Sequence, residues 1–213
     1  MTVNFKNLAE AMLEERYMAL KATLIFIVML ATTTALGDQY KLDAAHSNVS
    51  FKVRHLGISN VRGSFQKFEG TGKFDPKTNK ISDIKVKISA DSIDTNEPDR
   101  DKHLRSDDFF DVAKHPSITF VSTKVEYAGN KPSKIIGDFT LRGVKKKITL
   151  NVEEWGGAAE DAWGNKKLAF EASGKIDRRE YGLTWNKGLK KVGGLTVGND
   201  VKLILEVQGM KAN

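Results

Sequence analysis

The sequence contains no cysteine, only four prolines and almost no long hydrophobic run. The absence of cysteine excludes a disulfide framework, a thiolate zinc site, an iron–sulfur centre, a thiol nucleophile and a lipid anchor on cysteine. Stability must therefore come from a packed core, and 213 residues are enough to form one in a single domain. Positive charge is in excess, with a formal net charge of +7, so the surface should attract anions.

One apolar stretch, Leu24–Ala31, stands near the N-terminus behind the basic residues Arg16 and Lys21. It is far shorter than the roughly 20 residues needed to cross a bilayer. It ends in Ala35-Leu36-Gly37, which places small residues at the two positions that a signal peptidase reads. This arrangement is typical of a signal peptide, and an uncleaved membrane anchor is the alternative.

We therefore expect residues 1–37 to be an N-terminal extension plus signal peptide, with translation starting at Met18 and cleavage before Asp38. Residues 38–213 would then form the mature domain. An export signal on a chain without cysteine favours the periplasm of a Gram-negative bacterium.

Apolar and polar residues alternate with a period of two along much of the mature region. The alternation begins at Ser47 and runs to His55, where Ser, Lys and Arg separate the apolar residues. Comparable runs predict further strands at Gly63–Phe74, Ile84–Ala90, Ile118–Tyr127, Ile135–Leu141, Val144–Val152, Leu168–Ile176 and Val201–Val207.

These eight amphipathic strands are joined mainly by short turns. They favour an all-β fold that closes into an up-and-down antiparallel barrel, because an open sheet of this size would leave two long edges. A two-sheet sandwich is the alternative. Strands and helices do not alternate, which argues against a parallel α/β sheet.

Residues 91–115 interrupt the strands and carry helix signals. Asn96 is a candidate N-cap, Pro98 stands near the first helical position, and the acidic Glu97 lies in the first turn. Ser106 is a second candidate cap. We expect one or two short helices here, lying across one mouth of the barrel.

On such a helix Arg100, His103 and Leu104 share one face, whereas Asp101 and Arg105 share another. Arg100 and His103 would then form an anion clamp at the barrel mouth. The simpler alternative is a solvated helix with an ion pair between Asp101 and Arg105.

Other sequence signals for chemistry are weak. No His-x-His or His-Glu-x-x-His spacing occurs, so we expect no metal site. The glycines between Gly182 and Gly198 lack the Gly-Lys-Ser/Thr of a phosphate loop, and no hydrolase motif is present. We assign no catalytic residue and no cofactor. The export signal and the scattered aromatic residues argue against nucleic acid as a partner.

Several inward-facing positions on the predicted strands are unusual. Gly70 and Gly72 share a face with Phe68 and Phe74, and His55 ends the inward face of the first long strand. Because glycine weakens a strand, these glycines indicate either barrel curvature or an empty channel, and both explanations remain open. His55 is either a hydrogen-bonded core residue or a polar group in the lumen.

A set of ordered motifs runs through the mature region: Leu42-Asp43-x-x-His46-Ser47, Val61-x-Gly63-x-Phe65, Asp91-Ser92-Ile93-x-Thr95, Arg100-Asp101-x-His103-Leu104, Pro116-x-Ile118-x-Phe120 and Arg178-x-Glu180-Tyr181-Gly182. Together with Gly137-x-Phe139-x-Leu141 and Val197-Gly198-Asn199-x-Val201, they resemble the motifs of the YceI-like polyisoprenoid-binding family, and the resemblance covers Tyr40 to Val207. Two departures are minor, because Glu180 and Asn199 stand where the family often has aspartate.

The resemblance implies a lipocalin-like periplasmic barrel that holds an isoprenoid quinone or a polyprenyl phosphate, often as a homodimer and with no catalysis. Arg100 and His103 would bind the headgroup. The lipid tail would contact Phe51, Val53, His55, Phe68, Phe74, Val86, Ile88, Phe109, Phe120, Phe139 and Phe170.

Two other functions stay open. The first is an enzyme acting on such a lipid, with His103 as acid or base and Arg100 stabilising phosphate charge. The second is a structural module whose basic face contacts an anionic membrane surface through Lys85, Lys87, Lys145 and Lys147.

Overall fold

The computed structural model describes residues 37–187 and 196–212, so the predicted signal peptide lies outside the described residues. Within these ranges the chain forms eleven strand segments in one antiparallel sheet. They are β1 (Asp38–Leu42), β2 (Asn48–His55), β3 (Ser59–Phe65), β4 (Phe68–Asp75), β5 (Lys80–Ser89), β6 (Ile93–Asp94), β7 (Ser117–Ala128), β8 (Lys131–Leu141), β9 (Val144–Glu160), β10 (Lys166–Asp177) and β11 (Val197–Lys211). The helical elements are α2 (Pro98–Arg105) and the 3-10 turns η1 (Ala44–His46), η2 (Ala90–Ser92) and η3 (Arg178–Tyr181).

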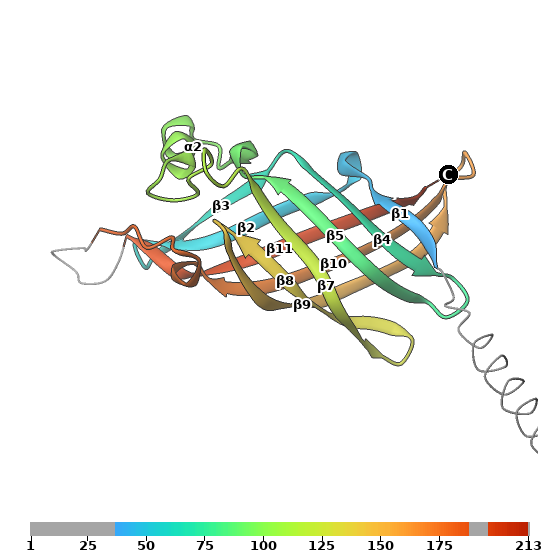
Figure 1. Ribbon diagram of the computed structural model, residues 1–213. Helices are drawn as coiled ribbons and strands as arrows, with labels where there is room; N and C mark the ends of the chain where they lie inside the picture. Colours follow the sequence, from blue (N-terminus) through green and yellow to red (C-terminus); the bar gives the residue numbers. More distant parts are fainter. Residues whose placement is uncertain (1–36, 188–195, 213) are drawn as a thin grey trace, which may run out of the picture. The chain divides into compact units, whose positions relative to one another are not determined.

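The sheet closes into a barrel because β1 pairs with β4 on one side and with β11 on the other (Figure 1). β1 and β2 lie end to end along β11, and β4 and β3 lie end to end beside them. Counted in this way, the barrel has eight antiparallel strands, each beside its neighbours in sequence. The predicted up-and-down barrel is confirmed, and the sandwich alternative is wrong.

The predicted strand Gly63–Phe74 is divided in two at its middle. The amide N–H groups of Gln66 and Lys67 donate to the carbonyl oxygen and the hydroxyl of Ser92 at 2.9 and 3.0 Å, instead of joining the barrel ladder. β1 precedes the alternation that begins at Ser47, so the sequence pattern does not predict it.

Residues 91–115 contain the predicted helix, α2, but its N-cap is Glu97 and not Asn96. The Glu97 carboxylate accepts hydrogen bonds from the amides of Asp99 and Arg100 at 3.2 and 2.6 Å. Asn96 instead has a φ of 62°, in the left-handed region that asparagine tolerates. Ser106 is the C-cap of α2. Among the described residues, no helix is both long and apolar enough to cross a membrane.

The predicted ion pair between Asp101 and Arg105 does not form. The buried Asp101 carboxylate accepts hydrogen bonds from the amide and the hydroxyl of Thr95, at 2.9 and 2.5 Å. The Arg105 guanidinium donates to the carbonyl oxygens of Asp91 and Ile93 at 2.8 and 2.7 Å. These bonds attach α2 to the end of the barrel beside β6, opposite the end that carries β1 and the C-terminus (Figure 1). We refer to these as the α2 end and the β1 end.

Candidate functional site

The barrel encloses an apolar cavity of about 220 Å³. A single water needs only about 10–15 Å³ of such space, so the side chains leave room for a much larger ligand. The cavity wall runs the length of the barrel, from Tyr40 and Leu168 at the β1 end to Leu104 and Leu183 at the α2 end. The interior is therefore a channel and not a fully packed core.

Several side chains that line the cavity are only half-buried. On β5, Ile81 and Ile88 are buried, whereas Ile84 and Val86 between them are only half-buried although they line the cavity. Leu203 on β11 is likewise half-buried. These side chains face inward, because the positions that alternate with them carry outward-facing charges, and they border the empty space of the cavity.

The glycines within the strands differ in their roles. Gly72 lines the cavity, and a Cβ atom added there would approach no heavy atom closer than 3.5 Å. A Cβ atom on Gly174 would lie 2.8 Å from Cδ2 of Leu150 and 3.1 Å from the carbonyl oxygen of Thr149, so a larger residue here would displace the Leu150 side chain. The Phe51 ring on the paired strand packs over Gly63, where a Cβ atom would lie 2.5 Å from the ring and would force it to move.

Most of the predicted tail contacts share the cavity wall: Phe51, Val53, Val86, Ile88, Phe109, Phe120, Phe139 and Phe170. Three others lie elsewhere. Phe74 packs against Tyr40 at the β1 end, with ring centroids 5.9 Å apart. Phe68 is half-buried opposite Ile88, and His55 lies at the end of β2. Contact of any of these residues with a lipid stays a prediction.

Arg100 and His103 do not line the cavity, and each has a local partner. The Arg100 guanidinium donates to the hydroxyl and the carbonyl oxygen of Thr95 at 2.8 and 2.7 Å. Nε2 of His103 lies 2.8 Å from a carboxylate oxygen of Asp108. The structure thus does not bring the two side chains together as a clamp facing the lumen, and it gives no support to His103 as an acid or base acting there.

At the α2 end the cavity wall includes a buried cation, Arg178, which is not among the predicted site residues, whereas Lys41 and Lys73 border the cavity toward the β1 end. The Arg178 side chain is buried, and its guanidinium donates only to carbonyl oxygens. The acceptors are Gly198 at 2.8 Å, Trp185 at 3.0 Å, Val197 at 3.3 Å and also Leu183. A guanidinium has five N–H donors, so one of them has no partner among the described residues.

No carboxylate in the described part of the chain forms an ion pair with Arg178, because the adjacent Asp177 pairs with Arg179 at 2.5 Å. Burial lowers the pKa of Arg178, an effect that Asp177 opposes, but a guanidinium stays charged in a protein. The sequence did contain a signal for this residue. Arg178 continues the inward alternation of Phe170 and Ile176 by one further step.

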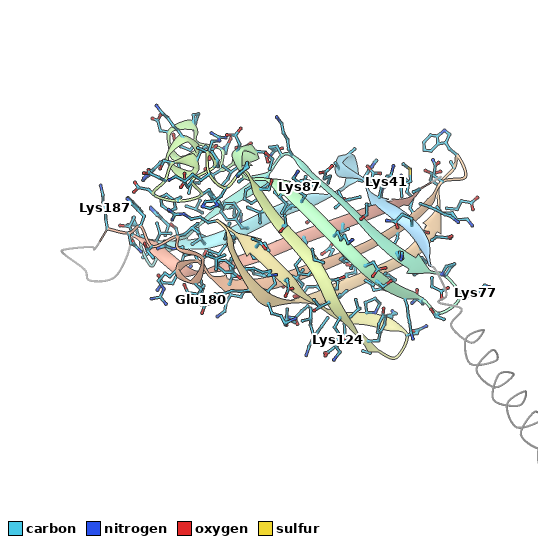
Figure 2. All side chains as sticks on the ribbon, viewed as in Figure 1. Lys41, Lys77, Lys87, Lys124, Glu180 and Lys187 are labelled. Carbon is cyan, nitrogen blue, oxygen red and sulfur yellow. The ribbon has the colours of Figure 1, made fainter. Side chains whose placement is uncertain are left out.

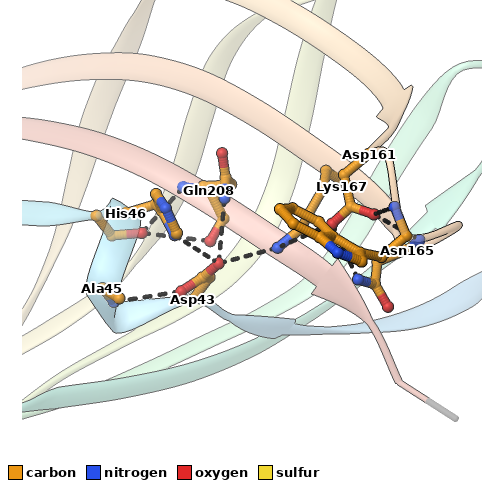
Figure 3. A network of polar contacts seen from close by, with 9 residues as sticks. Asp43, Ala45, His46, Asp161, Asn165, Lys167 and Gln208 are labelled. Atoms are coloured by element: carbon orange, nitrogen blue, oxygen red, sulfur yellow. Dashed lines mark hydrogen bonds and ion pairs between the residues drawn. The ribbon is translucent and has the colours of Figure 1, made fainter.

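A network of polar contacts stabilises the β1 end (Figure 3). The Asp43 carboxylate accepts hydrogen bonds from Nδ1 of His46 at 3.0 Å and from Lys167 and Gln208 at 3.1 Å. Burial alone would raise the pKa of Asp43, but hydrogen bonds from Lys167, His46 and Gln208 outweigh it and lower the pKa to about 2. The network joins η1 to β10 and β11, which is a structural role.

Two of the lysines predicted to form a basic face stand opposite carboxylates. Lys87 on β5 pairs across the sheet with Glu69, and Lys147 lies 3.6 Å from Asp138. Figure 2 shows Lys87 projecting outward from the barrel. Membrane contact through this face stays a prediction. Among residues 37–187 and 196–212, no group of three potential metal ligands is present.

Comparison with known proteins agrees with the geometry. The profile of the YceI-like domain matches residues 40–209. Protein YceI of Salmonella arizonae is 38% identical over 186 residues, which covers 86% of this chain and 93% of the relative. The crystal structure of the Campylobacter jejuni YCEI protein is 35% identical, with a TM-score of 0.65 over 81% of this chain and 97% of that one.

A polyisoprenoid binding domain from Saccharophagus degradans has the same fold at 15% identity, with a TM-score of 0.55 over 81% of this chain and 98% of that domain. At this identity, the likeness extends to the fold alone.

Proposed function

The chain belongs to the YceI-like domain family, and from this premise we propose that it binds a long isoprenoid lipid in the barrel cavity and carries or stores it. The ligand is an isoprenoid quinone or a polyprenyl phosphate. The chain acts as a binding protein, with no chemical step of its own.

The observation that carries this proposal is the unfilled apolar channel of about 220 Å³. Burial of an isoprenoid tail there removes apolar surface from water at about 25 cal/mol per Å² before the costs of association, so a long tail supplies the affinity. The Saccharophagus degradans domain with this fold is described as polyisoprenoid binding, which supports the same class of ligand.

The position of Arg178 determines which way the lipid lies in the cavity. Arg178 is a buried positive charge on the wall at the α2 end, and its remaining N–H donor suits either a phosphate oxygen or a quinone carbonyl oxygen. The headgroup would then lie beside Arg178 and the tail would run toward Tyr40. This role replaces the one that the sequence analysis gave to Arg100 and His103.

The lipid is handled in the periplasm, after export and cleavage before Asp38. Support for this location comes from the sequence of residues 1–37 alone. Fractionation of the producing cell and the intact mass of the recovered protein test it. A chain that retains residues 18–37 and stays with the cytoplasmic fraction would contradict it.

The lipid proposal is tested with Leu203→Trp, which fills the channel, and with Ile204→Trp, which places the same side chain on the outer face of the same strand. Lipids are extracted from the purified proteins and identified by mass spectrometry. We expect an isoprenoid lipid with the parent chain and Ile204→Trp, and its loss from Leu203→Trp with retained β-sheet circular dichroism.

Equal lipid content in the two variants would contradict binding in the channel. A parent chain that carries no isoprenoid and takes up neither an added quinone nor an added polyprenyl phosphate would contradict the ligand class.

A further inference from the structure

At the tip of the hairpin between β2 and β3, Leu56 has a backbone conformation that is unfavourable for leucine. The amide of Ile58 donates to the carbonyl oxygen of His55 at 3.2 Å, and the two residues between them have positive φ, 52° at Leu56 and 73° at Gly57. This is the geometry of a type I′ turn, whose first central position is favourable for Asn, Asp or Gly. Leucine is strained there, because its Cβ atom approaches the following carbonyl oxygen.

The same tip exposes apolar side chains. Ile58 is 81% exposed and Leu56 is 38% exposed. The amide of Leu56 donates to the carbonyl oxygen of Thr196 at 2.9 Å, which holds the tip beside the start of β11 at the α2 end. Backbone strain and exposed apolar surface both oppose folding in water. Because both occur at this tip, at Leu56 and Ile58, they indicate a function for it.

A row of cations crosses the outer wall behind the tip. Arg62 on β3 stands directly opposite Lys52 on β2, and Lys52 is opposite Lys202 on β11. Lys202 is in turn opposite Lys175 on β10. Lys52, Lys175 and Lys202 point outward, because residues that alternate with them line the cavity, and Arg62 lies on the same face of the sheet because it is directly opposite Lys52.

Like charges placed directly opposite each other destabilise a sheet. Lys175 is compensated by Asp200 at 3.0 Å, but in the described part of the chain Lys52, Arg62 and Lys202 form no ion pair. An external anion would relieve the repulsion within this row.

Negative charge lies farther from the tip on the same wall. Glu171 on β10 stands opposite both Glu154 on β9 and Glu206 on β11. Glu206 follows Lys202 by four positions, roughly 13 Å along an extended strand. The cation row therefore lies on the side of this carboxylate cluster that faces the tip, so a negatively charged surface would be attracted to the row and repelled by the cluster.

We propose that the tip and the cation row form a docking surface for an anionic lipid bilayer. Leu56 and Ile58 enter the boundary between headgroups and acyl chains, and Lys52, Arg62 and Lys202 contact lipid phosphates. Apolar insertion combined with electrostatic attraction is the usual physical basis of interfacial binding. This proposal does not depend on which ligand binds in the cavity, so it is independent of the isoprenoid proposal.

The absence of cysteine from the chain allows a local test of insertion. Ser59→Cys, beside the tip, and Ser82→Cys, exposed on β5 toward the β1 end, are each labelled with a polarity-sensitive fluorophore. Vesicles of phosphatidylglycerol and phosphatidylethanolamine should shift the emission of the Ser59 label to the blue, and brominated acyl chains should quench it. The Ser82 label should not respond, and phosphatidylcholine vesicles should have little effect.

Two variants test the two parts of the surface. In the labelled Ser59→Cys background, Ile58→Ser and Lys202→Glu should each weaken vesicle binding about tenfold. Their matched controls are Val121→Ser, which removes an exposed apolar residue on β7, and Lys80→Glu, which reverses an exposed charge at the start of β5 near the β1 end. The controls should change binding less than about twofold.

Leu56→Asn separates docking from folding, because the two should change in opposite directions. Asparagine relieves the left-handed strain and should raise Tm by about 2–4 °C, while the loss of the apolar side chain weakens vesicle binding.

Absence of a vesicle-dependent shift at Ser59, or binding unchanged by Lys202→Glu, would overturn the proposal. So would sedimentation showing that the parent chain self-associates, that Ile58→Ser makes it monomeric and that vesicles leave the Ser59 label unaffected. That result would assign the surface to a second copy of the chain.

Discussion

At the β1 end of the barrel, Tyr40, Phe74 and Trp155 pack ring against ring, with centroid separations of 5.9 and 6.2 Å. The Asp43 carboxylate there has three side-chain donors. At the α2 end, by contrast, the buried Arg178 guanidinium has only carbonyl partners and the nearby hairpin holds a strained leucine. The β1 end thus has packed rings and a fully hydrogen-bonded carboxylate, both of which stabilise the fold. The α2 end has a buried charge and a strained residue, which cost stability, and these lie where we propose that the lipid headgroup and the membrane bind.

The largest expected effect tests packing at the β1 end. Phe74→Ala removes a ring that is only 2% exposed and should lower the free energy of unfolding by about 3–5 kcal/mol in urea titrations. Because Phe74 is not on the cavity wall, the lipid recovered from the folded protein should be unchanged. Ile58→Ala at the exposed tip should change stability by less than about 0.5 kcal/mol. Equal losses in the two variants would remove the contrast between the ends.

The second prediction concerns the charge at the α2 end. Arg178→Gln leaves several buried carbonyl groups without donors and should cost about 3 kcal/mol of unfolding free energy. Arg179→Gln breaks an ion pair in which the arginine is more than half exposed and screened by solvent, so its effect on stability should be far smaller.

A readout other than stability separates the two roles of Arg178. Lipid extracted from Arg178→Gln should be depleted in species with an anionic headgroup relative to lipid from Arg179→Gln. If the two variants carried the same lipids, Arg178 would be a purely structural residue.

The third prediction follows from the pKa of Asp43, which hydrogen bonding lowers to about 2 from an ordinary value of 3.8. A carboxylate with a depressed pKa contributes stability fully above the unfolded-state pKa, and the contribution is lost as pH falls through the folded-state value. Asp43→Asn should therefore cost about 2 kcal/mol at neutral pH. Urea titrations should show the difference from the parent disappearing between about pH 4 and pH 2, whereas a difference independent of pH would contradict this account.

The smallest expected effect is a change in Tm, which compares charge pairing on β10 with charge pairing on β4. Glu171 faces glutamates on both neighbouring strands, whereas Glu69 faces Lys87. Glu171→Lys should therefore raise Tm by about 1–2 °C, and Glu69→Lys should lower it by a similar amount. Shifts of the same sign would show that cross-strand charge pairing does not distinguish the walls.

Much of the fold could be predicted because the side-chain period of a strand is a local property. Alternation along Ser47–His55 and Val201–Val207 identified both the strands and their inward faces, and most of the predicted tail contacts do lie on the cavity wall. Helix signals located α2 but misplaced its N-cap by one residue. Asn96 and Glu97 are adjacent, and each has a side-chain oxygen that could accept a hydrogen bond from the first turn. Only the folded backbone shows that the Glu97 carboxylate does so.

The sequence by itself determined that the barrel would have an apolar interior, a charged exterior and one helical interruption, because each follows from residues close together in the chain. The tertiary structure alone decided that the interior is hollow, that Arg178 is buried without a carboxylate and that Lys52 faces Lys202. These features depend on register and closure, which bring together residues as distant in sequence as Asp43 and Gln208. No local pattern encodes such a pairing, since it is fixed by the packing of the whole barrel.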